Sequence, residues 1–203
     1  MIVPARRPID ELRAEAAGCR ACDLWRSATQ TVFGEGRAPS RMMLVGEQPG
    51  DQEDKAGRPF VGPAGRVLDE ALTDAGIDRS SIYVTNIVKH FKWTERGKRR
   101  IHQSPSRVEV VACQPWFTAE LRLVKPEVLV VLGAVAAKAI FGAAFRVTSQ
   151  RGVELEGPAG VTTIATLHPS AILRGEPDSR KARMRDLVDD LTLASQIVER
   201  VSS

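Results

Sequence analysis

The stretch MMLVGEQPGDQEDKAGRPFVGPAG, residues 42–65, indicates how this chain folds. Its first four residues form an apolar run typical of a buried strand, and a polar turn with five glycines follows at once. Proteins built from alternating strands and helices bind ligands where loops leave the carboxyl ends of parallel strands. The acidic side chains Glu47, Asp51, Glu53 and Asp54 crowd this turn, which is therefore the candidate floor of an active site.

The rest of the chain repeats the rhythm of strand and helix. Strands are predicted at residues 41–45, 82–86, 128–132 and 162–167, and helices at residues 9–17, 64–75, 106–123, 134–141 and 183–201. An irregular loop is predicted from residue 89 to about Pro105. Strands separated by helices imply right-handed crossovers and a sheet covered on both faces. We therefore expect an α/β fold of three layers, α/β/α, with a central four-stranded parallel sheet.

Length and composition favour one domain over residues 1–203. The chain is 43% apolar and long enough to bury a core. No run approaches the roughly 18 apolar residues of a membrane span, and the N-terminus does not resemble a signal peptide. We expect a soluble, cytoplasmic monomer with no membrane partner and no obligate protein partner.

Positive charge is concentrated in one part of the chain. The totals of 29 basic and 25 acidic residues give a net charge of +4, which permits an anionic partner without demanding one. The region from residue 89 to 107 contains one acidic residue, Glu95, among Lys89, Lys92, Arg96, Lys98, Arg99, Arg100 and Arg107. Composition alone predicts a solvated basic loop that grips phosphates.

Polar residues stand at the ends of two further strands. His168 follows the last predicted strand, where Pro169 ends the ladder, and Asn86 ends the second. A single histidine is more often an ordinary core or surface residue, and a single asparagine can simply cap a turn. The carboxyl ends of parallel strands meet at one edge of a sheet, so Glu47, Asn86 and His168 are expected to face a common site.

Cys19, Cys22 and Cys113 are the chain's three cysteines. An odd number makes a disulfide framework a poor explanation in a cytosolic protein. The C-x-x-C spacing of the first two favours a metal or cluster site over three unligated thiols.

Four motifs together resemble the uracil-DNA glycosylase superfamily, close to its iron-sulfur type, family 4. They are the C-x-x-C pair, GEQPGDQEDKAGRPFVGPAGRVLD, YVTNIVKH and LHPSAILR, and they span residues 19–191 in the expected order. The resemblance implies the uracil-DNA glycosylase fold. It also implies a DNA-repair enzyme of the hydrolase class, which flips uracil out of DNA and cleaves its N-glycosidic bond.

The resemblance also implies roles for particular residues. Phe60 stacks on uracil, the Asn86 amide pairs with the N3 and O4 edge, and the backbone amide near Gln48 meets O2. His168 is the matching donor that stabilises charge on O2, and Asp51 positions the loop or a water.

DNA contacts follow from the same likeness. Residues 172–174, after His168-Pro169-Ser170, correspond to a loop that wedges into DNA in this superfamily. Ser170 and Arg174 are therefore candidate DNA contacts, together with the basic residues Lys98 and Arg99.

One departure from family 4 concerns the cluster ligands. That family carries four cysteines around a [4Fe-4S] cluster, the third in a Lys-Cys pair, whereas this chain has Lys89-His90 there. His90 is thus the expected fourth ligand beside Cys19, Cys22 and Cys113. Zinc at these four residues is equally defensible from residue types alone.

A second departure is the run Lys-Arg-Arg-Ile-His, residues 98–102. It resembles the signature insertion of the UdgX branch, in which the histidine attacks the sugar and stays attached. In this interpretation His102 is the nucleophile of a single-turnover reaction, Glu47 orients it through a hydrogen bond, and Arg100 shapes the loop. Gln48 stands where better-known relatives have a water-activating aspartate. Arg99 and Arg100 are expected to favour the neutral imidazole, whereas the hydrogen bond to Glu47 would take up its proton, and residue types alone leave open which of these opposing influences dominates.

Two alternatives remain at this point. The first is an ordinary turnover glycosylase of family 4, in which His102 only contacts phosphate. The second is a non-enzymatic DNA-binding or zinc module that uses the basic loop and the C-x-x-C pair.

Overall fold

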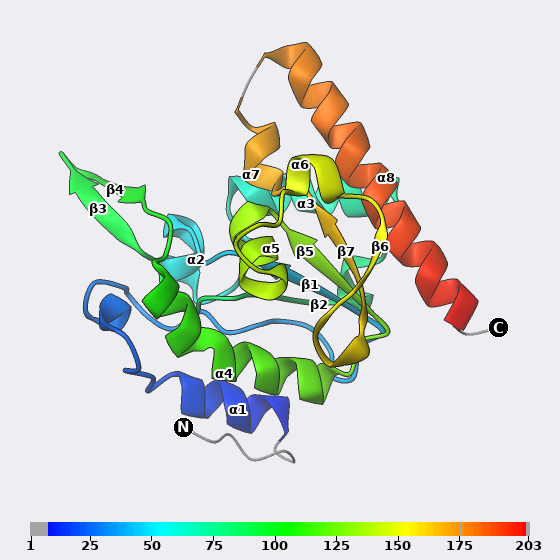
Figure 1. Cartoon of the computed structure of the whole chain (residues 1–203). Helices are drawn as coiled ribbons and strands as arrows, with labels where there is room; N and C mark the ends of the chain where they lie inside the picture. The colour runs from blue at the N-terminus through cyan, green and yellow to red at the C-terminus, as the bar shows by residue number, and fades with distance from the viewer. Residues whose placement is uncertain (1–7, 175, 202–203) are drawn as a thin grey trace.

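A computed structural model describes residues 8–174 and 176–201, whose centre is a five-stranded sheet in the order β2-β1-β5-β7-β6 (Figure 1). Its strands are β1 Met42–Gly46, β2 Tyr83–Asn86, β5 Val128–Leu132, β6 Glu154–Glu156 and β7 Thr162–Thr166. The four predicted strands are parallel, but the prediction left out β6, which pairs antiparallel with β7. This edge strand is three residues long and partly exposed, so it gives no apolar run in the sequence.

Helices cover both faces of the sheet, as expected for three layers (Figure 1). Every residue of β1 and β5 is buried, which is typical of parallel strands packed on two sides. Alternate residues of β1 point to opposite faces. Leu44 packs with α3 Pro63–Asp74 and α8 Pro177–Val201. Met43 and Val45 pack with α4 Arg107–Val124 and α5 Ala134–Phe141.

The predicted irregular loop is wrong over part of its length, because it contains a two-stranded hairpin. Strands β3 Trp93–Arg96 and β4 Arg99–His102 pair antiparallel around Gly97, whose φ of 61° suits the turn. Most of the hairpin's residues are exposed, so it lacks the apolar alternation that marks a half-buried strand. Figure 1 shows it as an arm that stands away from the sheet.

The glycine-rich turn is also more regular than predicted. It contains α2 Asp51–Ala56, which begins after Gly50 and ends at Gly57 with a φ of 71°. The last helix, α8, begins at Pro177 rather than at residue 183, because its first turns are charged and exposed. Shorter elements connect the rest: α1 Ile9–Ala16, η1 Asp23–Arg26, η2 Arg79–Ser81, α6 Val147–Gln150, η3 Pro158–Gly160 and α7 Pro169–Ile172. Within the described ranges, none of the helices has the length and apolar content needed to span a membrane.

Candidate active site

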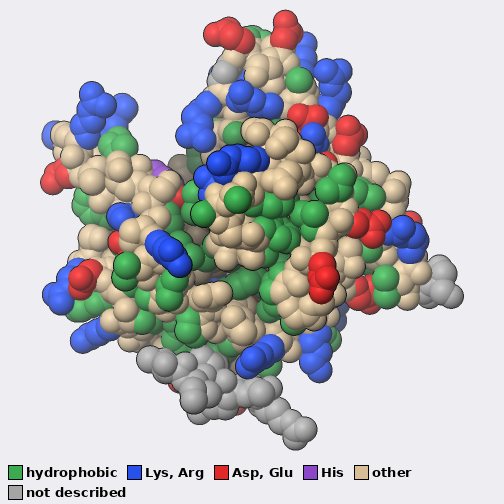
Figure 2. All heavy atoms as spheres, in the orientation of Figure 1, with side chains coloured by type: hydrophobic (Ala, Val, Ile, Leu, Met, Phe, Trp, Pro, Cys, Tyr) green, Lys and Arg blue, Asp and Glu red, His purple; other side chains and the backbone are tan. Residues whose placement is uncertain are grey.

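The ends of all four parallel strands meet at a hollow of about 680 Å³. Glu47 and Gln48 follow β1, Asn86 ends β2, Gly133 follows β5 and His168 follows β7, and all except the glycine are polar. The predicted convergence of strand ends is therefore confirmed. In Figure 2 a histidine surface is visible in the depression between the hairpin arm and α7.

One wall of the hollow combines an aromatic ring with a side-chain amide. Phe60 is buried and takes a left-handed φ of 55°, which is unusual for a residue with a side chain. Gly46 lies between the two groups: a Cβ there would sit 2.5 Å from Asn86 Oδ1 and 2.7 Å from Phe60 Cζ. Asn86 Oδ1 is buried and has no hydrogen-bond partner within the described residues. This wall suits a flat ligand that offers an N–H donor.

Glu53 also lines the hollow, although the sequence patterns predicted no particular role for it. Its carboxylate accepts a hydrogen bond from Gly62 N at 2.8 Å and so holds the turn that carries Phe60. A Cβ at Gly50 would lie 2.6 Å from Glu53 Oε2, and one at Gly62 would lie 2.9 Å from Oε1. Gly50 and Gly62 make room for this carboxylate. The presence of a glycine on each side of Glu53 is the sequence feature from which its role in the site could have been predicted.

His168 is held as a neutral hydrogen-bond donor. Its Nδ1 accepts from Ser170 N at 3.1 Å and lies 2.8 Å from Ser170 Oγ, so the ring proton belongs on Nε2. Burial lowers the pKa of His168 to about 4, and the nearby His102 and Arg174 act in the same direction. Ser170, predicted to contact DNA, here orients the imidazole.

His102 ends β4 and reaches the hollow with its side chain 47% exposed. Its Nε2 lies 2.9 Å from Gln48 Nε2. An amide nitrogen can only donate, so this contact favours a ring with the proton on Nδ1 and a lone pair on Nε2. Burial, and then Arg174, lowers the pKa of His102. Arg99 and Arg100 were expected to lower the pKa of His102, but the causes found in the structure are burial and the charge of Arg174.

Glu47 lies beside His102 without the predicted hydrogen bond. Glu47 Oε1 is 4.0 Å from His102 Nε2, and it is buried with no hydrogen-bond partner among the described residues. Gln48 orients the ring instead, and its amide nitrogen, which has two hydrogens, shares them among His102 Nε2, Lys92 O and Gln103 O at the base of the hairpin. Burial raises the pKa of Glu47, against a hydrogen bond with Ser104 and the charge of Arg174.

Arg100 braces the hairpin against α2. Its Nε lies 2.6 Å from Asp51 Oδ1 and its Nη1 lies 2.6 Å from Asp54 Oδ2. Its guanidinium also lies 5.4 Å from the ring centres of Phe91 and Trp93. Neither Arg100 nor Asp51 is among the described residues that line the hollow. The geometry thus gives the predicted catalytic Arg100 and the predicted substrate-binding Asp51 a supporting position.

Basic side chains flank the hollow on two sides. Lys98 and Arg99 are exposed at the hairpin, and Arg174 is exposed where it lines the hollow. Figure 2 shows Lys and Arg surfaces both on the hairpin arm and around α7 and α8. A polyanion could therefore lie across the opening between these two elements.

The predicted metal ligands are only partly brought together. Cys19 and Cys113 are buried, Cys22 is half-buried, and all three thiols are free. Burial raises the pKa of Cys113 to about 11, and the neighbouring Cys22 and Cys19 add to the rise. His90 Nδ1 is buried without a hydrogen-bond partner in the described ranges, while its Nε2 lies 2.9 Å from Thr31 Oγ1.

Within residues 8–174 and 176–201, no group of three or more His, Cys, Asp or Glu side chains is arranged to hold a metal ion. The expectation of four converging ligands is therefore not met in this structure. The donor types still fit a soft metal or an iron-sulfur cluster, because they are three thiols and one imidazole nitrogen that has no partner in the described part of the chain.

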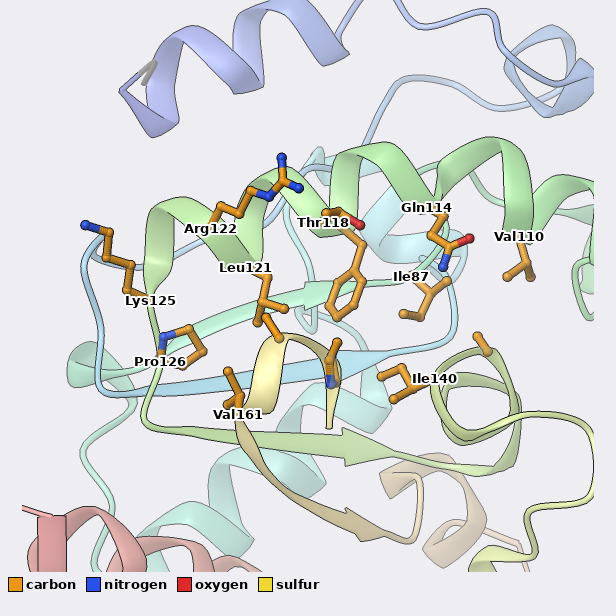
Figure 3. A pocket seen from close by; sticks show the side chains of 14 residues that line it. Ile87, Val110, Gln114, Thr118, Leu121, Arg122, Lys125, Pro126, Ile140 and Val161 are labelled. Carbon is orange, nitrogen blue, oxygen red and sulfur yellow. The ribbon is translucent and has the colours of Figure 1, made fainter. Parts of the chain in front are cut away.

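A second hollow of about 590 Å³ lies between α4, α5 and η3 (Figure 3). Its lining is largely apolar, with Ile87, Leu121 and Ile140 among the side chains drawn. The described lining residues include two cations, Arg122 and Lys125, but no carboxylate, imidazole or thiol. The first hollow, by contrast, is lined by the carboxylates of Glu47 and Glu53 and by the imidazoles of His102 and His168.

Comparison with known proteins relates the chain to a family of DNA glycosylases. The family model described as the uracil DNA glycosylase superfamily matches residues 33–192. The chain is 35% identical to the type-4 uracil-DNA glycosylase of Thermotoga maritima over 183 residues, which cover 90% of each protein. It is 35% identical to that of Pyrobaculum aerophilum, over 88% of this chain and 91% of the relative. It is 36% identical to that of Archaeoglobus fulgidus, over 81% and 83%.

Proposed function

Because the chain belongs to the uracil-DNA glycosylase superfamily, we propose that it excises uracil from DNA in repair and then remains attached, through His102, to C1′ of the abasic sugar. One observation carries the second half of this proposal. His102 Nε2 faces a donor, Gln48 Nε2 at 2.9 Å, and so keeps a lone pair inside the hollow that contains Asn86, Phe60 and His168.

Uracil is recognised by the wall that Phe60 and Asn86 form. The base stacks on the Phe60 ring after it leaves the DNA helix. Asn86 Oδ1, which lacks a partner among the described residues, accepts from N3–H, and the same amide's NH₂ donates to O4. Cytosine has an acceptor at N3 and a donor at C4, so it would leave both ends of the amide unsatisfied.

The leaving base is stabilised by His168. Cleavage of the N1–C1′ bond sends its electron pair to the base, where negative charge gathers on N1 and O2. His168, neutral and with its proton on Nε2, donates to O2 as that charge develops. The backbone N–H near Gln48 is the second candidate donor. The released uracil anion then takes a proton from solvent.

As the glycosidic bond breaks, the lone pair of His102 Nε2 leaves its hydrogen bond with Gln48 and attacks C1′. The new Nε2–C1′ bond makes an imidazolium, which returns to neutral when Nδ1 loses its proton to solvent. Glu47 Oε1, 4.0 Å from Nε2, stabilises the positive charge on the sugar and then on the ring. A nucleophile held beside the reacting carbon acts at a high effective concentration, so it outcompetes water. The N-alkyl product has no evident route of release, and one molecule reacts once.

The alternative is a turnover glycosylase of family 4 in which His102 contacts phosphate. A uracil-containing oligonucleotide, incubated with the protein and run on a denaturing gel, separates the two. We expect a heat-stable shifted band at one protein per DNA. Multiple turnovers with free abasic DNA would support the alternative, and no reaction of any kind would remove both.

Replacement of the nucleophile is the first prediction. His102→Ala should abolish the shifted band while uracil release continues, because water can then reach the sugar. Arg99→Ala, on the same exposed strand, is the matched control: it removes a basic residue but no nucleophile, so the band should persist. An adduct that survives His102→Ala would remove His102 from its role.

We further propose that Cys19, Cys22, Cys113 and His90 hold a [4Fe-4S] cluster, with zinc as the alternative. The support is the donor set, since three free thiols accompany an imidazole nitrogen that has no partner among the described residues. Such a cluster would stabilise the fold, because glycosidic cleavage transfers no electron. A brown protein containing iron and inorganic sulfide is the expected result, and a colourless protein with stoichiometric zinc would contradict it.

A further inference from the structure

The segment that follows His168 presents one exposed apolar side chain beside the hollow. Ile172, which the sequence grouped with the wedge, is 6% exposed and packs in the core with α3 and α8. Leu173 is 41% exposed, and Arg174 beside it lines the hollow. The wedge of this chain is therefore reduced to Leu173, whose position depends on how residues 171–174 are held.

Arg183 fastens this segment at both ends. Its Nη1 donates to Ala171 O and to Arg174 O, each at 2.7 Å. These carbonyls bracket Ile172 and Leu173. Ala171 O lies in the one-turn helix α7, whose last carbonyls lack helical partners, and Arg174 O lies just beyond the C-cap Leu173. Hydrogen bonds from a charged donor are short and strong. Within the described ranges Arg183 makes no ion pair, so its charge is directed at the two carbonyls.

The helix that carries Arg183 is a rigid support. Leu187, one turn further along α8, is fully buried, and Leu191 packs with it against the sheet. Arg183 is half-buried between this anchored part of the helix and the wedge segment. A change at Arg183 therefore frees residues 171–174, two of which line the hollow, without changing Phe60, Asn86 or His168.

We propose that Arg183 is a positioning residue for base extraction from duplex DNA. It holds Leu173 in the position from which this side chain enters the base stack. This inference rests on the proposed function. Extraction from a duplex requires unpairing and unstacking, and an inserted apolar side chain fills the gap that the base leaves. A single strand has no partner to unpair, so its uracil reaches the pocket without the wedge.

The test compares one uracil-containing strand, free or paired with its complement, in single-turnover assays of base release. Arg183→Met keeps an unbranched apolar stem and removes the guanidinium donors. We expect release from the duplex to fall about tenfold, the equivalent of about 1.4 kcal/mol in activation free energy, with release from the single strand within about twofold of wild type. Leu173→Ala should have the same selective effect, and Arg183→Lys should recover part of the duplex rate.

Arg185→Met is the matched control, because Arg185 is exposed on the same helix and the variant loses the same charge. Its duplex rate should stay near wild type. An equal loss by Arg183→Met on both substrates, at unchanged melting temperature, would reduce Arg183 to a structural residue. An equal duplex loss by Arg185→Met would assign the effect to charge. If the wild-type protein released uracil from neither substrate, the proposed function itself would fail, whereas release from the duplex alone would overturn only the role of the wedge.

Discussion

His102 and His168 line the same hollow, yet each ring is held by a different kind of partner. The backbone N–H of Ser170 donates to His168 Nδ1, so the proton stays on Nε2. The Gln48 amide donates toward His102 Nε2, so that atom keeps its lone pair. Both rings have a lowered pKa and are neutral at pH 7. Their partners thus make one a donor and the other a nucleophile.

Adduct formation should depend on pH in one direction only. His102 reacts as the neutral ring, and its pKa is lowered from the ordinary value of 6.5. The rate should therefore be constant at pH 7 and above, and should fall as pH drops through the lowered pKa. Protonation of Glu47, whose pKa is raised from 4.5, acts in the same direction. Single-turnover rates measured across this range check the shape.

Arg174→Met tests this pH dependence, because Arg174 lowers the pKa values of both His102 and Glu47. The acid limb should move to higher pH, independently of any loss of DNA affinity. Arg99→Met, on the exposed hairpin, should leave the midpoint where it is. A midpoint moved by Arg99→Met and not by Arg174→Met would contradict the assignment.

Sequence reasoning found the site residues that stand at strand ends and missed those that depend on a bend. Asn86 and His168 could be predicted because parallel strands deliver their last residues to one edge. The role of Glu53 depends on the fold of the turn at residues 57–62, and the burial of Ile172 depends on how α7 packs against α3 and α8. Neither follows from residue spacing alone.

At the scale of elements, the hairpin β3–β4 is the part that sequence patterns described least well. Its outward side chains are charged, and its pairing is specified by Gly97 and by cross-strand contacts rather than by an apolar face. Two sets of contacts at the base of the hairpin hold it in place instead. Arg100 links it to α2, and Gln48 links its base to the loop after β1.

Asp54 is the buried end of this link, so Asp54→Ala should loosen the hairpin. Its carboxylate is fully buried and accepts from Thr29 N, Thr29 Oγ1 and Arg100 Nη1. Removal of one partner from such a pair costs about 3 kcal/mol of unfolding free energy. We also expect slower adduct formation, because His102 is carried by the same hairpin. Urea unfolding and single-turnover gels measure the two effects.

Asp51→Ala is the comparison for that variant. Asp51 binds the same arginine but is more exposed, with 36% of its side chain accessible. Its pair with Arg100 should contribute about 1 kcal/mol or less. An Asp54→Ala protein as stable as wild type, or one that forms the adduct at the wild-type rate, would show that the hairpin is held by other contacts.

For the whole molecule, the four parallel strands and the three layers follow from the sequence, whereas the order of the strands in the sheet and the buried charges do not. Lys89 was counted in the basic region of residues 89–107, and Glu120 lies in the helix predicted at residues 106–123, yet both are fully buried. The three N–H donors of Lys89 all find acceptors: Thr85 Oγ1, Asn86 O and Glu120 Oε2. Glu120 also accepts from Gly34 N and Tyr83 OH. This network joins β2, α4 and the base-reading end of the sheet.

The last prediction is a double-mutant cycle on this pair. Lys89→Met or Glu120→Gln alone leaves one buried charge without its partner, which should cost about 3–5 kcal/mol of unfolding free energy. The double variant buries no charge, and the amide that Glu120→Gln introduces would still offer a carbonyl to Gly34 N and Tyr83 OH. The double variant should therefore lose less unfolding free energy than the two single variants together, by about 1–3 kcal/mol. Urea unfolding of the wild type, the two single variants and the double variant, matched for metal content, measures these free energies.

The control is Glu127→Gln, at the exposed pair with Arg41, which should cost at most about 1 kcal/mol of unfolding free energy. Additive losses at Lys89 and Glu120 would mean that the two side chains stabilise the fold separately, through their other hydrogen bonds.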